Sequence, residues 1–158
     1  MATAGKNLSE YNREEVPQAG DLKIGIVVSQ WNSEITEALY EGAFSTLLDC
    51  GAKEENISRW NVPGSFELVY GSKKIIEDVK PDAVIAIGSV IRGETAHFDF
   101  VCQAATQGIK DLNVQGDTPV IFCVLTDDTW QQAKDRSGGK HGNKGSEAAV
   151  AAIQMASL

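Results

Sequence analysis

The chain repeats one pattern four times: a short apolar run is followed by a longer segment with apolar residues at helical spacing. The short runs are rich in β-branched residues, which is typical of buried strands. We expect these strands at 22–29, 57–62, 82–87 and 119–125. The amphipathic segments predict helices that begin near residues 33, 66, 95, 129 and 146 and end near residues 50, 79, 108, 136 and 157.

Strands that alternate with helices predict an α/β fold in which one parallel sheet is covered on both faces. Right-handed crossovers then give a flavodoxin-like three-layer αβα sandwich, with four strands in the order 2-1-3-4. Residues 1–21 are polar without sustained periodicity, and we interpret them as an N-terminal arm that adds to a neighbour's sheet edge. Residues 22–158 are expected to form a single domain.

Composition narrows the class of protein. With 158 residues, 42% of them hydrophobic and 23% charged, the chain matches an ordinary globular domain. Its formal net charge of -8 argues against nucleic acid or a membrane surface as a partner. No apolar run approaches about 18 residues and no basic-then-apolar leader is present, so we expect neither a membrane span nor a signal peptide. The widely spaced Cys50, Cys102 and Cys123 predict reduced thiols in a cytoplasmic protein.

The stretch 88–101 (GSVIRGETAHFDFV) joins the third strand to the third helix. A Gly-bracketed turn that leads into a helix presents free N–H groups and the positive end of the helix dipole, and both favour an anion. His97 lies in the first helical turn, where the dipole disfavours imidazolium, so we expect a neutral ring that can act as a base. A single histidine at a helix start is also typical of a surface or capping residue.

The other strand-to-helix joints add chemistry at the same edge of the sheet, where open α/β sheets place their ligands. Trp31 follows the first strand and either stacks on a flat ring or only packs over the sheet edge. Glu67 follows the second strand, where an acid also complements the helix dipole. Cations follow the fourth strand in and beside a Gly-rich loop, a type that is equally common as a solvated turn: Arg136, Lys140 and Lys144.

Several kinds of site are excluded by the motifs that the sequence lacks. Neither a Walker A pattern nor a GxGxxG after the first strand is present, so we expect no nucleotide phosphate loop. No Ser/His/acid or Cys/His set has nucleophile-elbow spacing. His97 and His141 are too few and too isolated for a metal site. The residues by themselves predict an enzyme or binder for a small phosphate-bearing ligand with a planar polar ring, using one histidine and no metal.

Five motifs in collinear order resemble the lumazine synthase family, the 6,7-dimethyl-8-ribityllumazine synthases of riboflavin biosynthesis. They lie at 30–32 (QWN), 62–68 (VPGSFEL), 88–101, 119–126 (PVIFCVLT) and 142–145 (GNKG). The resemblance extends over about residues 22–158 and implies a transferase that needs no cofactor. Such an enzyme condenses 5-amino-6-(D-ribitylamino)uracil with 3,4-dihydroxy-2-butanone 4-phosphate and releases phosphate and water.

The resemblance also implies a role for each matching residue. It makes His97 the proton-transfer residue and Arg136 the cationic partner of the substrate's phosphate. It implies that Trp31 stacks on the pyrimidine ring and that Phe122 closes the ring pocket, with Phe122 and Arg136 supplied by a neighbouring subunit. The remaining contacts are those of the ribityl chain or ring (Ser65, Phe66, Glu67), of the ring pocket (Ser89, Val90, Ile91) and of the phosphate at the helix start (Glu94, Thr95).

Assembly is implied by the same resemblance: a homo-oligomer of at least five chains, either a pentamer or a hollow icosahedral shell of twelve pentamers. The short loop after Arg136 favours the shell. Trp31 stands where the family commonly has Phe, and Cys123 where it usually has Gly. The alternative function is a non-catalytic flavin- or lumazine-binding or shell-forming protein on the same fold. The presence of both His97 and Arg136 favours the enzyme.

Overall fold

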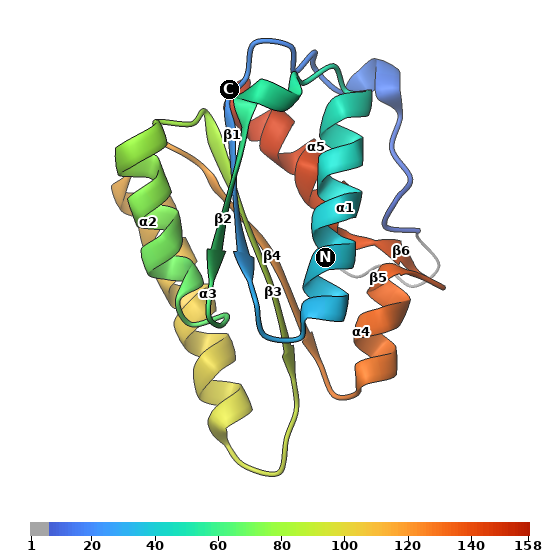
Figure 1. Ribbon diagram of the computed structural model, residues 1–158, viewed down its shortest axis with the longest axis vertical. Coiled ribbons are helices and arrows are strands. Elements are labelled where there is room, and N and C mark those ends of the chain that lie inside the picture. The colour runs from blue at the N-terminus through green and yellow to red at the C-terminus, as the bar shows by residue number, and fades with distance from the viewer. Residues whose placement is uncertain (1–6) are drawn as a thin grey trace.

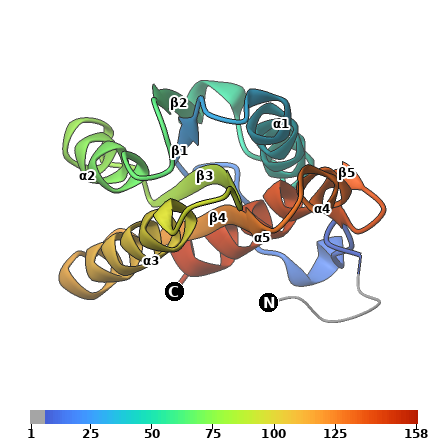
Figure 2. The same ribbon diagram turned by 90° about the horizontal axis from the view of Figure 1, so that it is seen from below.

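The computed structural model describes residues 7–158 and shows an α/β sandwich of three layers (Figure 1). Figure 2 shows a sheet in the middle, with α2 and α3 over one face and α1, α4 and α5 over the other. In chain order the main elements are β1 (Ile24–Ser29), α1 (Ser33–Asp49), β2 (Ile57–Val62), α2 (Leu68–Val79), β3 (Ala83–Ile91), α3 (His97–Gln115), β4 (Val120–Asp127), α4 (Trp130–Arg136) and α5 (Lys144–Ala156). The smaller ones are the 3-10 turns η1 (Arg13–Glu15) and η2 (Glu54–Asn56) and the short strands β5 (Ser137–Gly139) and β6 (Gly142–Asn143).

The main sheet has the strand order β2-β1-β3-β4, and every neighbouring pair is parallel. This confirms the flavodoxin-like sandwich that the alternation of strands and helices predicts. At the end of β1, Ser29 lies opposite Val62 of β2, and Val28 lies opposite Ile87 of β3. The carboxyl ends of all four strands consequently meet at one edge, the lower one in Figure 1.

The central strands are apolar at nearly every position because both of their faces are covered. Successive side chains point to opposite faces, so Ile26 and Val28 join one core while Val27 joins the other. The larger core includes the inner faces of α1 and α5, and the smaller core those of α2 and α3. Gly145 at the start of α5 lies directly on the carbonyl of Leu39, a close approach that leaves no room for a side chain.

The described part of the N-terminal segment, residues 7–20, packs across the ends of other elements. Its Val16 and Ala19 are buried in the larger core. The Leu8 N–H donates to the carbonyl of His141 at 2.8 Å, and the Ala19 N–H donates to that of Cys50 at 3.0 Å. The first six residues of the predicted arm lie outside the described residues. Within residues 7–158, no helix has the length and apolarity needed to cross a membrane.

Two element boundaries differ from the sequence prediction around β3 and α3. The third strand continues past Ile87 to Ile91, because β4 extends alongside it and pairs Ile91 with Asp127. The third helix runs to Gln115 and takes in most of the polar stretch before β4. The Asn113 side chain bonds the backbone N–H and C=O of Val120 at 2.8 and 2.9 Å. The polar residues at the end of α3 therefore do more than face solvent, because Asn113 also connects the helix to β4.

Other helix starts also shifted. The second helix begins at Leu68, after rather than at the 65–67 stretch. The fourth begins at Trp130, one residue after the expected start, where the side chains of Thr129 and Gln132 form a capping box, and Asp127 ends β4. The last helix begins at Lys144, two residues early, and the preceding Gly-rich loop contains the β5–β6 hairpin.

Candidate active site

A cavity of about 570 Å³ opens at the carboxyl edge of the sheet, where the chain leaves β1, β2 and β3. The sequence-predicted residues that line it are Trp31, Ser65, Phe66, Glu67, Ser89, Val90, Ile91, Thr95 and His97. The other lining residues are Pro63, Gly64, Gly93, Phe98 and Val101. Three joints that are far apart in the sequence therefore build one cavity.

The first wall is the joint between β1 and α1. Trp31 is 73% exposed, so one aromatic face is open to a ligand. Its backbone N–H donates to the carbonyl of Pro63 at 3.2 Å, and Nδ2 of Asn32 donates to the carbonyl of Ser89 at 2.9 Å. Asn32 has a φ of 58°, a left-handed conformation that asparagine tolerates better than most residues. This wall is therefore fastened to both of the others.

The second wall is the joint between β2 and α2, which packs closely on β3. A Cβ added at Gly88 would lie 2.7 Å from Oγ of Ser65, so only glycine permits the approach. Ser65 is buried, and so is Ser89 on the facing strand. Within the described residues, neither hydroxyl has a hydrogen-bond partner. A buried polar group without a partner costs free energy, so a ligand that bonds these hydroxyls removes the cost.

The third wall is the turn from β3 into α3. His97 is the first residue of α3 and is exposed. Its backbone N–H donates to Oγ1 of Thr95 at 3.4 Å. No atom lies within 4 Å of the position that a Cβ at Gly93 would take. Open space thus precedes the N-terminus of a 19-residue helix, and the positive end of the helix dipole there favours an anion. Glu94 is exposed in the same turn and does not line the cavity.

Arg92 fixes this turn from outside the cavity. Its Nε donates to Asp128 at 2.8 Å and its Nη1 to Asp99 at 3.3 Å. The guanidinium carbon lies 4.1 Å from the centre of the Phe98 ring, within cation–π distance. The backbone N–H of Arg92 donates to the carbonyl of Asp127 at 2.9 Å. The turn is thereby held to α3 and to the end of β4.

The remaining predicted residues, Phe122 and Arg136, do not line the cavity. Phe122 is half-buried in the middle of β4, opposite Ala86, and packs against the smaller core. Arg136 ends α4, with Nη1 3.8 Å from Oδ1 of Asp127. In the described part of the chain, the cavity lining includes neither Lys nor Arg. The predicted cation is thus separated from the predicted histidine site within one chain.

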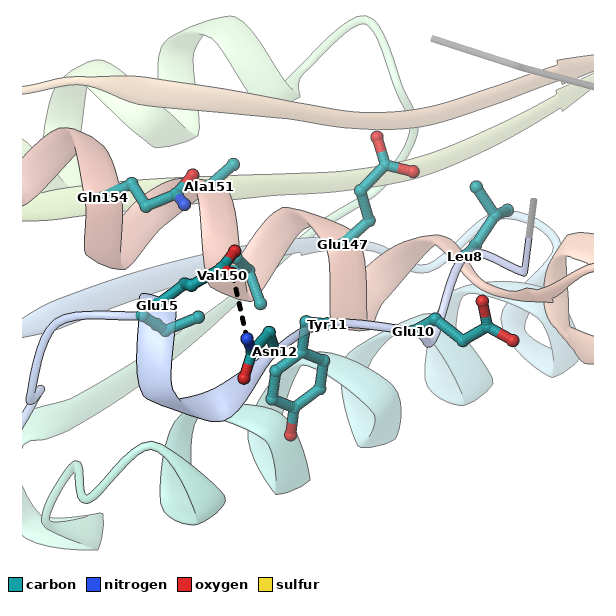
Figure 3. Close-up of a pocket in the computed structure, with 10 residues that line it drawn as sticks. Leu8, Glu10, Tyr11, Asn12, Glu15, Glu147, Val150, Ala151 and Gln154 are labelled. Carbon is teal, nitrogen blue, oxygen red and sulfur yellow. Dashed lines mark hydrogen bonds between the residues drawn. The ribbon is translucent and has the colours of Figure 1, made fainter.

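A second hollow, of about 620 Å³, lies between the N-terminal segment and α5 (Figure 3). Several of its polar side chains are bonded to other protein groups. Nδ2 of Asn12 donates to Glu15 at 2.9 Å, as the dashed line in Figure 3 marks, and the Tyr11 hydroxyl donates to Asp49 at 2.6 Å. Glu147 accepts from Lys144 at 2.6 Å. The Tyr11 hydroxyl and the Asn12 amide are thus bonded within the chain, whereas in the described residues the buried hydroxyls of Ser65 and Ser89 are not.

The cavity can hold a flat polar ring and an anion side by side. Aromatic faces and buried hydroxyls suit the ring, the helix N-terminus suits the anion, and His97 between them can move protons. Among residues 7–158, no group of three or more His, Cys, Asp or Glu side chains could hold a metal ion.

Sequence reasoning missed the residues that support the site. Phe98 and Val101 lie in the predicted joint at 88–101 but were given no role in a site, and both line the cavity. Asn32 and Arg92 brace two of the walls, which depends on partners more than 30 positions away. The sequence did contain one signal. Asn32 and Arg92 are polar residues within strand-to-helix joints, and from there each side chain bonds a group in another joint.

Comparison with known proteins gives concordant similarities. Residues 21–158 match the family described as 6,7-dimethyl-8-ribityllumazine synthase. Curated relatives with that name are similar over the whole chain: 65% identity in Flavobacterium psychrophilum, covering 100% of this chain and 84% of the relative, and 62% in Christiangramia forsetii, covering 100% and 95%. The relative in Porphyromonas gingivalis is 58% identical, with 100% and 98% covered.

Proposed function

We propose that the cavity at the sheet edge is the substrate site of this chain, which belongs to the 6,7-dimethyl-8-ribityllumazine synthase family. The chain is accordingly a transferase of riboflavin biosynthesis. It condenses 5-amino-6-(D-ribitylamino)uracil with 3,4-dihydroxy-2-butanone 4-phosphate. The observation that carries the proposal is that three separate joints bring the predicted ring-binding residues and His97 to one cavity.

The pyrimidine substrate occupies the part of the cavity between the first two walls. Trp31 and Phe66 are 73% and 59% exposed, and their aromatic faces suit stacking on the ring. The unbonded hydroxyls of Ser65 and Ser89 suit the ring's polar groups, and the exposed carboxylate of Glu67 suits the hydroxyls of the ribityl chain. Val90 and Ile91 complete the lining.

The phosphate of the second substrate binds at the turn before α3. The open space at Gly93, the hydroxyl of Thr95 and the positive end of the helix dipole support this position, with Glu94 beside it. A dianion there also requires a cation, which we assign to Arg136 of a neighbouring subunit.

His97 acts between these two substrates. The amino group of the pyrimidine attacks the ketone, and loss of water gives an imine. Loss of phosphate gives an enol that becomes a ketone, and the ribitylamino nitrogen attacks this ketone and closes the ring with loss of a second water. Each step moves a proton, and an imidazole at the mouth of the cavity can accept and return it. The protein's part is to hold both substrates close together and to move these protons.

The proposed assembly is a homo-oligomer of at least five chains, either a pentamer or an icosahedral shell. Phe122 and Arg136 lie outside the chain's own cavity, which supports a site completed by a neighbour. The described part of β4 pairs only with β3, so its other edge is open to a strand from another copy, whereas residues 7–20 pack on their own chain. A ring of such contacts closes by rotation.

Subunit exchange tests the shared site. Chains with His97→Ala and chains with Arg136→Ala are each expected to have low activity alone when the butanone phosphate is kept below the wild-type KM. Mixed under exchange, they should regain activity, because some sites receive both intact residues. Exchange that is confirmed by mass spectrometry but restores no activity would show that each site lies within one chain. A 17.0 kDa monomer with full activity in light scattering would contradict the assembly as well.

The assigned reaction is tested with the purified protein and its two substrates. We expect a fluorescent lumazine product without added metal or cofactor. A protein that binds lumazine or flavin but forms no product would be the non-catalytic alternative.

We also propose a cytoplasmic location for the single domain of residues 22–158, supported by the free thiols of Cys50, Cys102 and Cys123.

A further inference from the structure

A buried carboxylate lies beside the arginine that we assign to phosphate. Asp127, the last residue of β4, is only 8% exposed. Its Oδ1 lies 3.8 Å from Nη1 of Arg136, and within residues 7–158 its buried Oδ2 has no hydrogen-bond partner. Burial raises the pKa of Asp127, while the positive charge of Arg136 acts in the opposite direction. Asp127 thus faces Arg136 and lacks the bonds that normally accompany a buried carboxylate.

Arg136 owes its position to its own helix rather than to Asp127. Its Nη1 donates to the carbonyl of Gln132, one turn earlier in α4, at 3.0 Å. The capping box of Thr129 and Gln132 fixes the start of this helix. By contrast, the 3.8 Å between Nη1 of Arg136 and Oδ1 of Asp127 exceeds the length of an N–H···O hydrogen bond. Asp127 therefore attracts the guanidinium electrostatically but does not hydrogen-bond it.

The neighbouring carboxylate is engaged elsewhere. Asp128 is exposed and accepts from Nε of Arg92 at 2.8 Å, so an arginine other than Arg136 already neutralises it. Asp127 is therefore the acid whose charge acts mainly on Arg136. An anion that approaches Arg136 must therefore share the charge of the guanidinium with this carboxylate.

We infer that Asp127 competes with the substrate's phosphate for Arg136 and so weakens the hold of the site on phosphate. The inference rests on the proposed role of Arg136. The affinity of the site for the phosphate substrate is then lower than Arg136 alone would give. The inorganic phosphate released by the reaction also dissociates more easily. Asp127 acts through Arg136 and does not itself touch the substrate.

The test is the inhibition of the assembled enzyme by inorganic phosphate. Asp127→Asn keeps the shape of the side chain and removes its charge. We expect it to lower the inhibition constant of phosphate by roughly three- to tenfold, the range for a partly buried charge pair. The KM for the pyrimidine should stay at the wild-type value. The matched control is Asp135→Asn, which removes one negative charge next to Arg136 in sequence and leaves Asp127 intact.

A double variant separates this inference from the assignment on which it rests. In Arg136→Ala, the Asp127→Asn change should have no further effect on phosphate inhibition. If Arg136→Ala weakens phosphate but Asp127→Asn leaves it unchanged or weakens it too, the competition is disproved and the role of Arg136 stands. If Arg136→Ala itself does not change phosphate inhibition, the assignment of Arg136 fails. Titration calorimetry with inorganic phosphate provides the same comparison if turnover of a variant is too low to measure.

Discussion

Two hollows formed by the described residues are similar in size and differ in chemical character. The cavity at the sheet edge, of about 570 Å³, contains two buried hydroxyls that have no hydrogen-bond partner among residues 7–158, and a helix starts at its rim. The hollow beside α5, of about 620 Å³, contains Tyr11 and Asn12, both already bonded to carboxylates of the same chain. Judged by volume alone, the hollow beside α5 would be the better candidate for a ligand site.

The difference lies in what the polar groups are bonded to. In the hollow beside α5, the Tyr11 hydroxyl attaches the N-terminal segment to Asp49 of α1, so this polar group stabilises the fold. At the sheet edge the corresponding bonds are left for a ligand, and the fold bears the cost of two buried hydroxyls. The same chemical change should therefore affect binding at one hollow and stability at the other.

The largest expected effect comes from His97→Ala. A positioned proton-transfer group contributes about 10²- to 10⁴-fold to a rate. We expect kcat to fall by that range while the pyrimidine binds nearly as before, measured by steady-state assay and by titration of the pyrimidine. An unchanged kcat would remove His97 from the mechanism and the chemistry from this cavity.

The next effect is that of Arg136→Ala on the phosphate substrate. Loss of a charge-assisted contact of about 1.5–3 kcal/mol should raise the KM of the butanone phosphate about 10- to 100-fold and leave that of the pyrimidine nearly unchanged. Arg136→Lys should recover only part of the loss, because an ammonium group lacks the planar fork of guanidinium. Equal rises in both KM values would mean that Arg136 supports the fold or an interface instead.

A smaller effect is expected when the unpaired hydroxyls are removed. Ser65→Ala and Ser89→Ala should each weaken pyrimidine binding roughly two- to tenfold, the size of one neutral hydrogen bond. Thermal stability should stay the same or rise, because neither hydroxyl has a partner in the described residues. Lower stability with unchanged binding would assign these serines to the fold and erase the contrast between the hollows.

The smallest effect is that of Tyr11→Phe, and it should act on stability alone. Loss of the hydroxyl bond to Asp49 should lower the free energy of unfolding by about 0.5–1.5 kcal/mol, with both KM values unchanged. Burial and this bond raise the pKa of Tyr11 from 10.0 to about 12. The folded state thus favours the protonated hydroxyl, and its contribution is complete below pH 10 and lost as the pH rises towards 12. Urea titrations of both proteins across this interval should show the difference shrinking.

The sequence predicts the strand order of the fold well, but it predicts element boundaries and several residues of the site poorly. The alternation of apolar runs and amphipathic segments gives the strand order, because parallel strands with right-handed crossovers leave few arrangements. Boundaries such as the end of β3 were not predictable, since Ile91 extends the strand only because Asp127 of β4 pairs with it. The histidine and the aromatic residue could be placed from their positions after strands. Asp127 could not, because its burial beside Arg136 depends on where α4 ends.

The brace at Asn32 has a thermodynamic consequence. The backbone of Trp31 is bonded to Pro63 and the side chain of Asn32 to Ser89, so the walls of the cavity are already ordered without a ligand. The conformational entropy of that ordering is lost during folding. A flat ring that enters the cavity has only the indole's own two torsions left to restrict, a far smaller entropic penalty than ordering a loop. Preorganisation of this kind lets a small polar molecule bind with much of its contact energy retained as affinity.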